Sequence, residues 1–141
     1  MSITIAVVAQ GMMGSGVGKR LHERGAEVRT LLSGRSAASA DRARAAGMKP
    51  ASDEKALLDG AAFILSILPP GEAENLARQL APALSGLAKK PVYVDCNAIS
   101  PQTAQRVAAI SSSPADVMPA ALARSAVSVL RPLSEVSTLR P

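Results

Sequence analysis

Short apolar runs alternate with amphipathic segments along most of this chain. The first run, Ile3 to Val8, is rich in β-branched residues and is followed at once by glycines. This predicts a buried strand that ends in a turn. Beyond the turn, Met13, Val17 and Leu21 recur at four-residue spacing. The spacing predicts a helix over residues 12–24 that buries these three side chains.

The same alternation continues as far as residue 110. It predicts strands at residues 26–32, 48–50, 62–68 and 91–96, and helices at residues 36–46, 52–58, 73–80 and 102–110. Ser52 and Ser100 are the predicted N-caps of two helices, and Pro101 takes the first position of the last one. Strands that alternate with helices in this way predict an α/β fold with a Rossmann-like, doubly wound parallel sheet.

The turn after the first strand carries a glycine motif typical of dinucleotide-binding proteins, with alanine at its first position. Its residues are Ala9, Gln10, Gly11, Met12, Met13 and Gly14. Gly11 has no Cβ, so a pyrophosphate can approach the backbone, where the free N–H groups of the next helix point at it. The alternative is a helix N-terminus whose glycines serve packing alone. A triphosphatase P-loop is excluded, because Arg20 stands where its hydroxyl residue should be.

The end of the second predicted strand determines which dinucleotide fits. An acidic residue usually binds the free ribose 2′-hydroxyl of NAD at about this point. Here Leu31 to Ser36 contain no acid, and the first acid downstream is Asp41. Arg35 instead offers a guanidinium group, and Ser33 and Ser36 offer hydroxyls. The segment therefore predicts NADP rather than NAD; the alternative is a solvated loop arginine.

Four of the chain's candidate residues each follow a predicted strand, although they lie far apart in the sequence. They are Gly11, Arg35, Pro69 and Asn97. In open parallel sheets the ligand crevice lies at the carboxyl ends of the strands, so we expect these residues to converge there.

Together these residues resemble the N-terminal NADP-binding domain of the 6-phosphogluconate and 3-hydroxyisobutyrate dehydrogenase family of β-hydroxyacid dehydrogenases. The resemblance covers about residues 1–110. Gly11 to Gly14 match the family's Gly-x-Met-Gly turn, and Gly34 to Ser36 stand where members often have Asn-Arg-Thr. Leu68 and Pro69 match a Leu-Pro pair that lines the cofactor. Residues 94–101 resemble the motif Val-Asp-x-Ser/Asn-x-x-Ser-Pro, which implies that Asn97 lies beside the nicotinamide ribose.

The resemblance implies an NADP-dependent oxidoreductase that acts on a small-molecule β-hydroxyacid. The family's Ser-Gly-Gly loop, catalytic lysine and nearby asparagine have no counterpart here, since no glycine follows Gly86, no lysine follows Lys90 and no asparagine follows Asn97. We therefore assign no catalytic residue and expect the family's C-terminal helical domain to be missing. The alternative is a truncated or regulatory NADP-binding module without turnover of its own.

The last part of the chain is rich in Ser, Ala and Pro. We predict a cofactor domain over residues 1–112 and a divergent or truncated tail over residues 113–141, in which Ala115 to Met118 or Ala126 to Leu130 can add a sixth strand. An uncovered sheet edge favours association. We expect the chain to be marginally stable alone, or to form a homo-oligomer through residues 102–110.

Composition narrows the function classes further. The 141 residues are 48% apolar and carry a scattered net charge of +5, and Phe63 and Tyr93 are the only aromatics. Nucleic acid is not an expected partner, because base stacking and a basic stripe are lacking. A single cysteine, Cys96, suits a reducing compartment. The first apolar run lacks a basic lead and is too short to span a membrane, so we expect a cytoplasmic protein.

Three further polar residues are interpreted as structural. His22 faces away from the predicted buried stripe and has no metal-ligating partner nearby, so we expect it to be exposed, and we predict no metal site. Cys96 has no histidine near it in sequence and is expected to pack rather than act as a nucleophile. Asp95 is expected to accept hydrogen bonds from local backbone amides.

Overall fold

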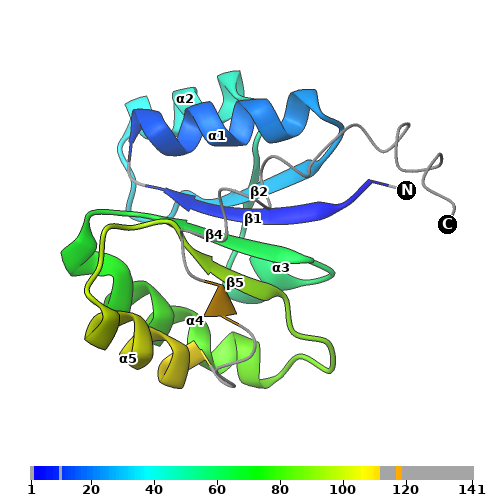
Figure 1. Cartoon of the computed structure of the whole chain (residues 1–141). Coiled ribbons are helices and arrows are strands. Elements are labelled where there is room, and N and C mark those ends of the chain that lie inside the picture. Colours follow the sequence, from blue (N-terminus) through cyan, green and yellow to red (C-terminus); the bar gives the residue numbers. More distant parts are fainter. Residues whose placement is uncertain (1, 10, 112–116, 119–141) are drawn as a thin grey trace, which may run out of the picture.

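A computed structural model of the chain describes residues 2–9, 11–111 and 117–118 (Figure 1). Its strands are β1 Thr4–Ala9, β2 Glu27–Leu31, β3 Lys49–Ala51, β4 Phe63–Ile67, β5 Val92–Asp95 and β6 Val117–Met118. Its helices are α1 Met12–Glu23, α2 Ala37–Ala45, α3 Glu54–Leu58, α4 Ala73–Ser85 and α5 Pro101–Ser111, and a 3₁₀ turn, η1 Pro70–Glu72, precedes α4. The strands and helices predicted up to residue 110 are all present, with shifts at their ends.

The strands form one parallel sheet in the order β3-β2-β1-β4-β5-β6. From β1 the chain first builds outward through β2 and β3, and then returns to build β4, β5 and β6 on the other side of β1. This is the strand order of the Rossmann fold, in which the reversal point lies between β1 and β4. The predicted doubly wound α/β fold is therefore confirmed.

The strand β6 extends the sheet beyond the five strands predicted up to residue 110. It pairs with β5, so that Tyr93 lies opposite Val117 and Val94 lies opposite Met118. It falls within the first of the two tail segments predicted to add a strand. The second segment, Ala126 to Leu130, lies outside the described residues. The division of the chain at residue 112 stays a prediction.

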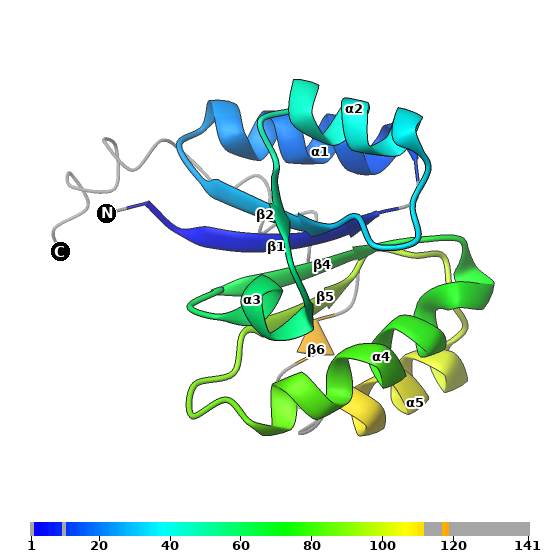
Figure 2. The same cartoon turned by 180° about the vertical axis from the view of Figure 1, so that it is seen from behind.

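Helices cover both faces of the sheet (Figure 2). The helices α1 and α2 lie over one face, and α3, α4 and α5 lie over the other (Figure 1). Successive side chains of a strand point to opposite faces, so β1 supplies both halves of the core. Ile5 and Val7 pack in the α1/α2 layer, whereas Ala6 and Val8 pack in the layer of α3, α4 and α5. Burial on both faces explains why β1 and β4 are almost entirely apolar.

The predicted buried stripe of α1 is wrong at Met13, which is 74% exposed. Leu21 is buried as predicted and Val17 is partly buried, but the other buried residues of the helix are Gly14 and Gly18. A Cβ on Gly14 would overlap the methyl group of Ala9, so the absent side chain sets how closely α1 approaches β1. A stripe traced through large apolar residues misses this face, because its contact surface is glycine.

The N-caps were predicted correctly for α5 and wrongly for α3. The Ser100 hydroxyl accepts a hydrogen bond from the Thr103 backbone N–H at 3.1 Å, directly before Pro101 opens α5. At α3 the cap is Asp53, not Ser52, because the Asp53 carboxylate accepts from the Ala56 N–H at 2.7 Å. Both residue types cap helices well, so a one-residue shift of the helix start decides between them.

Candidate cofactor-binding site

The turn between β1 and α1 presents bare backbone to open space. Gly11 is the N-cap of α1, is extended at φ 163° and ψ −159°, and forms no side-chain cap. A Cβ built on Gly11 meets no atom within 4 Å. The first N–H groups of the helix, at Met12 and Met13, therefore lie beside a space that an anion can enter. Gln10 of the same motif lies outside the described residues.

Two hollows lie at the carboxyl ends of the strands. The first, called here the α2 hollow, is lined by Ala9, Gly11, Ser15, Thr30, Leu32, Arg35, Ser39, Arg42, Ala43 and Met48. The second, called here the α4 hollow, is lined by Val8, Leu31, Ser33, Arg35, Leu68, Glu72, Asn75, Leu76 and Gln79. Arg35 lines both, so it joins the glycine turn on one side to the end of β4 on the other.

Arg35 sits in the loop between β2 and α2 and is partly buried. Burial, and then the positive charge of Arg42, lower the pKa of Arg35. Of the two serines predicted beside it, Ser33 lines the α4 hollow. The Ser36 hydroxyl instead caps α2, where it accepts from the Ser39 N–H at 3.2 Å. The structure therefore gives Ser36 a helix-capping contact.

A hydrogen-bond network ties the end of β4 to the end of β5. Asn97 is 8% exposed, and its Oδ1 accepts from the Leu68 N–H at 2.6 Å while its Nδ2 donates to Ser66 Oγ at 3.0 Å. The Asn97 N–H donates in turn to Asp95 Oδ1 at 2.8 Å, as predicted for Asp95. Asn97 thus positions the backbone at Leu68, which lines the α4 hollow. The sequence signal for this network is Ser66, the polar residue inside an apolar strand.

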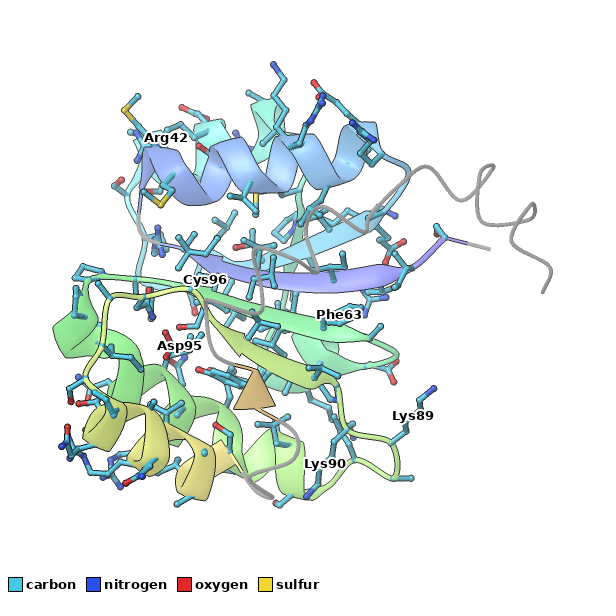
Figure 3. The ribbon with its side chains drawn as sticks, in the orientation of Figure 1. Arg42, Phe63, Lys89, Lys90, Asp95 and Cys96 are labelled. Carbon is cyan, nitrogen blue, oxygen red and sulfur yellow. The ribbon has the colours of Figure 1, made fainter. Side chains whose placement is uncertain are left out.

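Cys96 is the residue directly after β5 (Figure 3). Although Cys96 is exposed as a residue, desolvation of the thiol and the nearby Asp95 raise its pKa to about 11. The thiol is therefore protonated at neutral pH, which does not favour a nucleophilic role. His22 is exposed as predicted, and its ring lies where a side chain on Gly47 would be. Within residues 2–9, 11–111 and 117–118, no cluster of His, Cys, Asp or Glu side chains is placed to hold a metal.

Of the four strand-end residues predicted to converge, Gly11 and Arg35 line one hollow together, whereas Pro69 and Asn97 line neither hollow. Gly11 and Arg35 share the α2 hollow, Arg35 and Leu68 share the α4 hollow, and Asn97 holds Leu68. Pro69 is exposed and directly precedes η1. Sequence reasoning missed Ser39 and Arg42, which enter the α2 hollow from α2. Their three-residue spacing puts them on one face of that helix. The sequence pattern does not indicate that this face lies toward Arg35.

This strand order, with a glycine turn between β1 and α1, defines the class of dinucleotide-binding domains. The family model of the NAD binding domain of 6-phosphogluconate dehydrogenase matches residues 4–118. The chain belongs to this family of NAD-binding domains. No curated protein sequence matches the chain.

Solved structures with the same fold include several dehydrogenases. A conserved protein of unknown function, which is structurally similar to 3-hydroxyacid dehydrogenases, is 28% identical with a TM-score of 0.67 over 83% of this chain and 42% of its own. The 3-hydroxyisobutyrate dehydrogenase of Mycobacterium tuberculosis, solved with L-serine, is 24% identical with a TM-score of 0.66 over 84% of this chain and 39% of its own. The prephenate dehydrogenase of A. aeolicus, solved with NAD+, is 15% identical with a TM-score of 0.63 over 79% of this chain and 39% of its own.

The chain thus spans about two fifths of the length of these solved proteins. None of the helices in the part of the chain that the structure describes is both long and apolar enough to cross a membrane.

Proposed function

We propose that this domain binds NADP(H) at the turn around Gly11 and prefers it to NAD(H). The observation that carries the proposal is the position of Arg35, which lines both hollows at the end of β2, where NAD-binding domains usually place an acid. The first acid downstream, Asp41, is held by Arg44 at 2.8 Å on the exposed side of α2. No carboxylate between Leu31 and Ser36 opposes a 2′-phosphate.

The residues of this chain suit each part of the cofactor. The bare backbone at Gly11 and the start of α1 suit the pyrophosphate, and the α4 hollow, with Leu68 at its edge, suits the adenosine. Pro69 and Asn97 hold the backbone that follows β4. The family resemblance implies that the nicotinamide ribose lies beside Asn97. When bound, the nicotinamide ring would supply a hydride acceptor or donor, and these residues would hold and orient it.

The test is a titration of NADPH and NADH against the wild-type chain and Arg35→Ala. We expect tighter binding of NADPH by the wild type and a loss of about tenfold to a hundredfold for NADPH in Arg35→Ala, because a charge-assisted phosphate contact is removed. NADH binding should change little. Arg20→Ala is the matched control, since Arg20 pairs with Glu23 on the exposed side of α1. Equal wild-type affinities for the two cofactors would contradict the proposal.

For the whole protein, we propose NADP-dependent oxidation of a small β-hydroxyacid, or its reverse. The family membership and the 28%-identical structure that resembles 3-hydroxyacid dehydrogenases support this class of reaction. A cofactor-binding module without turnover is the second candidate, favoured by the family match, which is to a cofactor-binding domain alone. A steady-state assay with a panel of β-hydroxyacids, including 6-phosphogluconate, separates the two. Turnover by the purified chain would refute the module.

A further inference from the structure

A second arginine enters the α2 hollow beside Arg35. Arg35 reaches the hollow from the loop after β2, and Arg42 reaches it from the side of α2 that also presents Ser39. The two guanidinium groups are close enough that the charge of Arg42 contributes to the lowered pKa of Arg35. Gly11 and Ser15 line the same hollow from the start of α1. Two positive charges therefore face a space that also borders the glycine turn.

These two charges have no acidic partner among the residues that the structure describes. Arg35 and Arg42 take part in no ion pair there, whereas carboxylates do pair with Arg20, Arg29, Arg44, Arg78 and Arg106. Like charges that face one another repel, and an anion placed between them removes the repulsion. The hollow is thus electrostatically suited to a group of at least one negative charge.

Hydrogen bonds hold Arg42 in this orientation. Its Nη2 donates to Ser39 Oγ at 3.2 Å, and Ser39 Oγ accepts from Ser36 Oγ at 3.1 Å. Ser36 is fixed in turn as the N-cap of α2. Arg42 is also partly buried, so less side-chain freedom is lost when it binds a ligand than for a fully exposed arginine.

We infer that Arg42 is a specificity-determining residue that binds the ribose 2′-phosphate of NADP(H) together with Arg35. The inference rests on the proposed function and adds a second cationic ligand for the same phosphate. Two guanidinium groups offer more donors to three phosphate oxygens than one can, and each contact is charge-assisted. The cofactor pyrophosphate carries similar chemistry near Gly11, but it is common to NAD(H) and NADP(H). A role of Arg42 at the pyrophosphate would therefore affect both cofactors alike.

The experiment compares Arg42→Ala with Arg44→Ala in the full chain. Arg44 lies on the same helix but is exposed and paired with Asp41, so its removal should change no cofactor affinity by more than about threefold. NADPH, NADH and the isomeric fragments 2′,5′-ADP and 5′-ADP are titrated by calorimetry. For Arg42→Ala we expect NADPH and 2′,5′-ADP to weaken by about tenfold or more, and NADH and 5′-ADP to change by less than about threefold. Arg42→Met, which keeps the apolar stem, should behave as Arg42→Ala does.

The outcomes separate this inference from the proposed function. Unchanged NADPH affinity in both Arg42 variants, with a loss in Arg35→Ala, would overturn the role of Arg42 and leave the NADP preference intact. Equal losses for NADPH and NADH would overturn it in favour of a pyrophosphate contact. A wild-type chain that binds 2′,5′-ADP no better than 5′-ADP would overturn the proposed cofactor preference itself.

Discussion

Asp95 is the one buried acid in the described part of the chain, at 5% exposed. Its Oδ1 accepts from the Asn97 N–H, whereas its Oδ2 has no hydrogen-bond partner within residues 2–9, 11–111 and 117–118. Burial raises the pKa of Asp95, and the hydrogen bonds from Asn97 oppose this only in part. A carboxylate that is buried with one oxygen unpaired is costly to ionise. The hydrogen-bond network that positions Leu68 therefore includes a carboxyl group, that of Asp95, whose ionised form is disfavoured.

This leads to a prediction on the pH dependence of stability. The folded-state pKa of Asp95 is raised, so folding favours its protonated form, and stability is lost as the pH rises from the unfolded-state pKa through the folded one. Asp95→Asn removes that loss. We expect the melting temperature of Asp95→Asn, relative to wild type, to be higher at about pH 7 than at about pH 4. Asp59→Asn, at an exposed acid, is the control for a lost charge. A difference that does not vary with pH would contradict the prediction.

Individual residues were predictable where a local rule determines them. Asp95 binds an amide two residues away, and Ser100 caps the helix that begins next to it, so sequence neighbours suffice. The contact between Asn97 and Leu68 joins residues far apart in the sequence. It depends on the β4–β5 register, which one sequence does not determine.

At the scale of elements, the packing of α1 on β1 depends on a glycine paired with an alanine. Gly14 faces Ala9 so closely that a Cβ on Gly14 would occupy the position of the Ala9 methyl. The methyl group that Ala9 adds at the first position of the motif thus fits because Gly14, at the last position, has no side chain. The motif therefore serves helix packing at Gly14, and this packing leaves the backbone at Gly11 open to an anion.

We predict that Gly14→Ala destabilises the fold by about 1–3 kcal/mol, because the added methyl overlaps the Ala9 methyl, which β1 holds in place. Ala9→Gly in the same chain should recover part of that loss, since it removes the opposing methyl. Gly16→Ala is the matched control, because its Cβ would meet open space in the same helix. It should stabilise by about 0.5–1 kcal/mol. Urea unfolding of the wild type, the three single variants and the Gly14→Ala/Ala9→Gly double variant measures each value, and additive effects of Gly14→Ala and Ala9→Gly would rule out the contact.

The order of elements was predictable because each strand is a short apolar run that ends at glycine, proline or a polar residue. The side of a helix that faces the sheet was harder to predict. In α1 Leu21 is buried as predicted, but Gly14 is buried in place of Met13, because glycine forms the contact there. In α2 the path of the chain after β2 determines which face of the helix lies beside Arg35, so the sequence around Arg42 does not show that it lines the α2 hollow.

At the scale of the whole molecule, the candidate site lies across the reversal point of the sheet. The β1–α1 turn and the loops after β2, β4 and β5 come together at one edge, and Phe63 lies toward the opposite edge (Figure 3). This convergence was predictable from strand alternation alone, because parallel strands share the edge at which their carboxyl ends lie. The set of side chains that line the two hollows was harder to predict, because they come from loops and helices far apart in the sequence.

The outer edge of β5 is covered by the short strand β6. Tyr93, at 1% exposed, is the residue of β5 that lies opposite Val117, so this pairing borders the core. An uncovered β5 would present unpaired backbone groups and apolar side chains, which favour association between chains. Self-association through the β5 edge, as distinct from the face at residues 102–110, is therefore expected only when β6 is removed.

Two shortened chains test this role of β6. A version that ends at Met118 keeps the described strands and helices, and we expect it to melt close to the full chain. A version that ends at Ser111 loses β6, and we expect it to be less stable by about 1–3 kcal/mol, because the backbone bonds along β5 are lost. It should also sediment as a larger species, because the edge beside Val94 becomes free to pair with a second copy. If the version ending at Ser111 is a monomer with the melting temperature of the full chain, β6 contributes nothing to stability, and any association must arise from another surface.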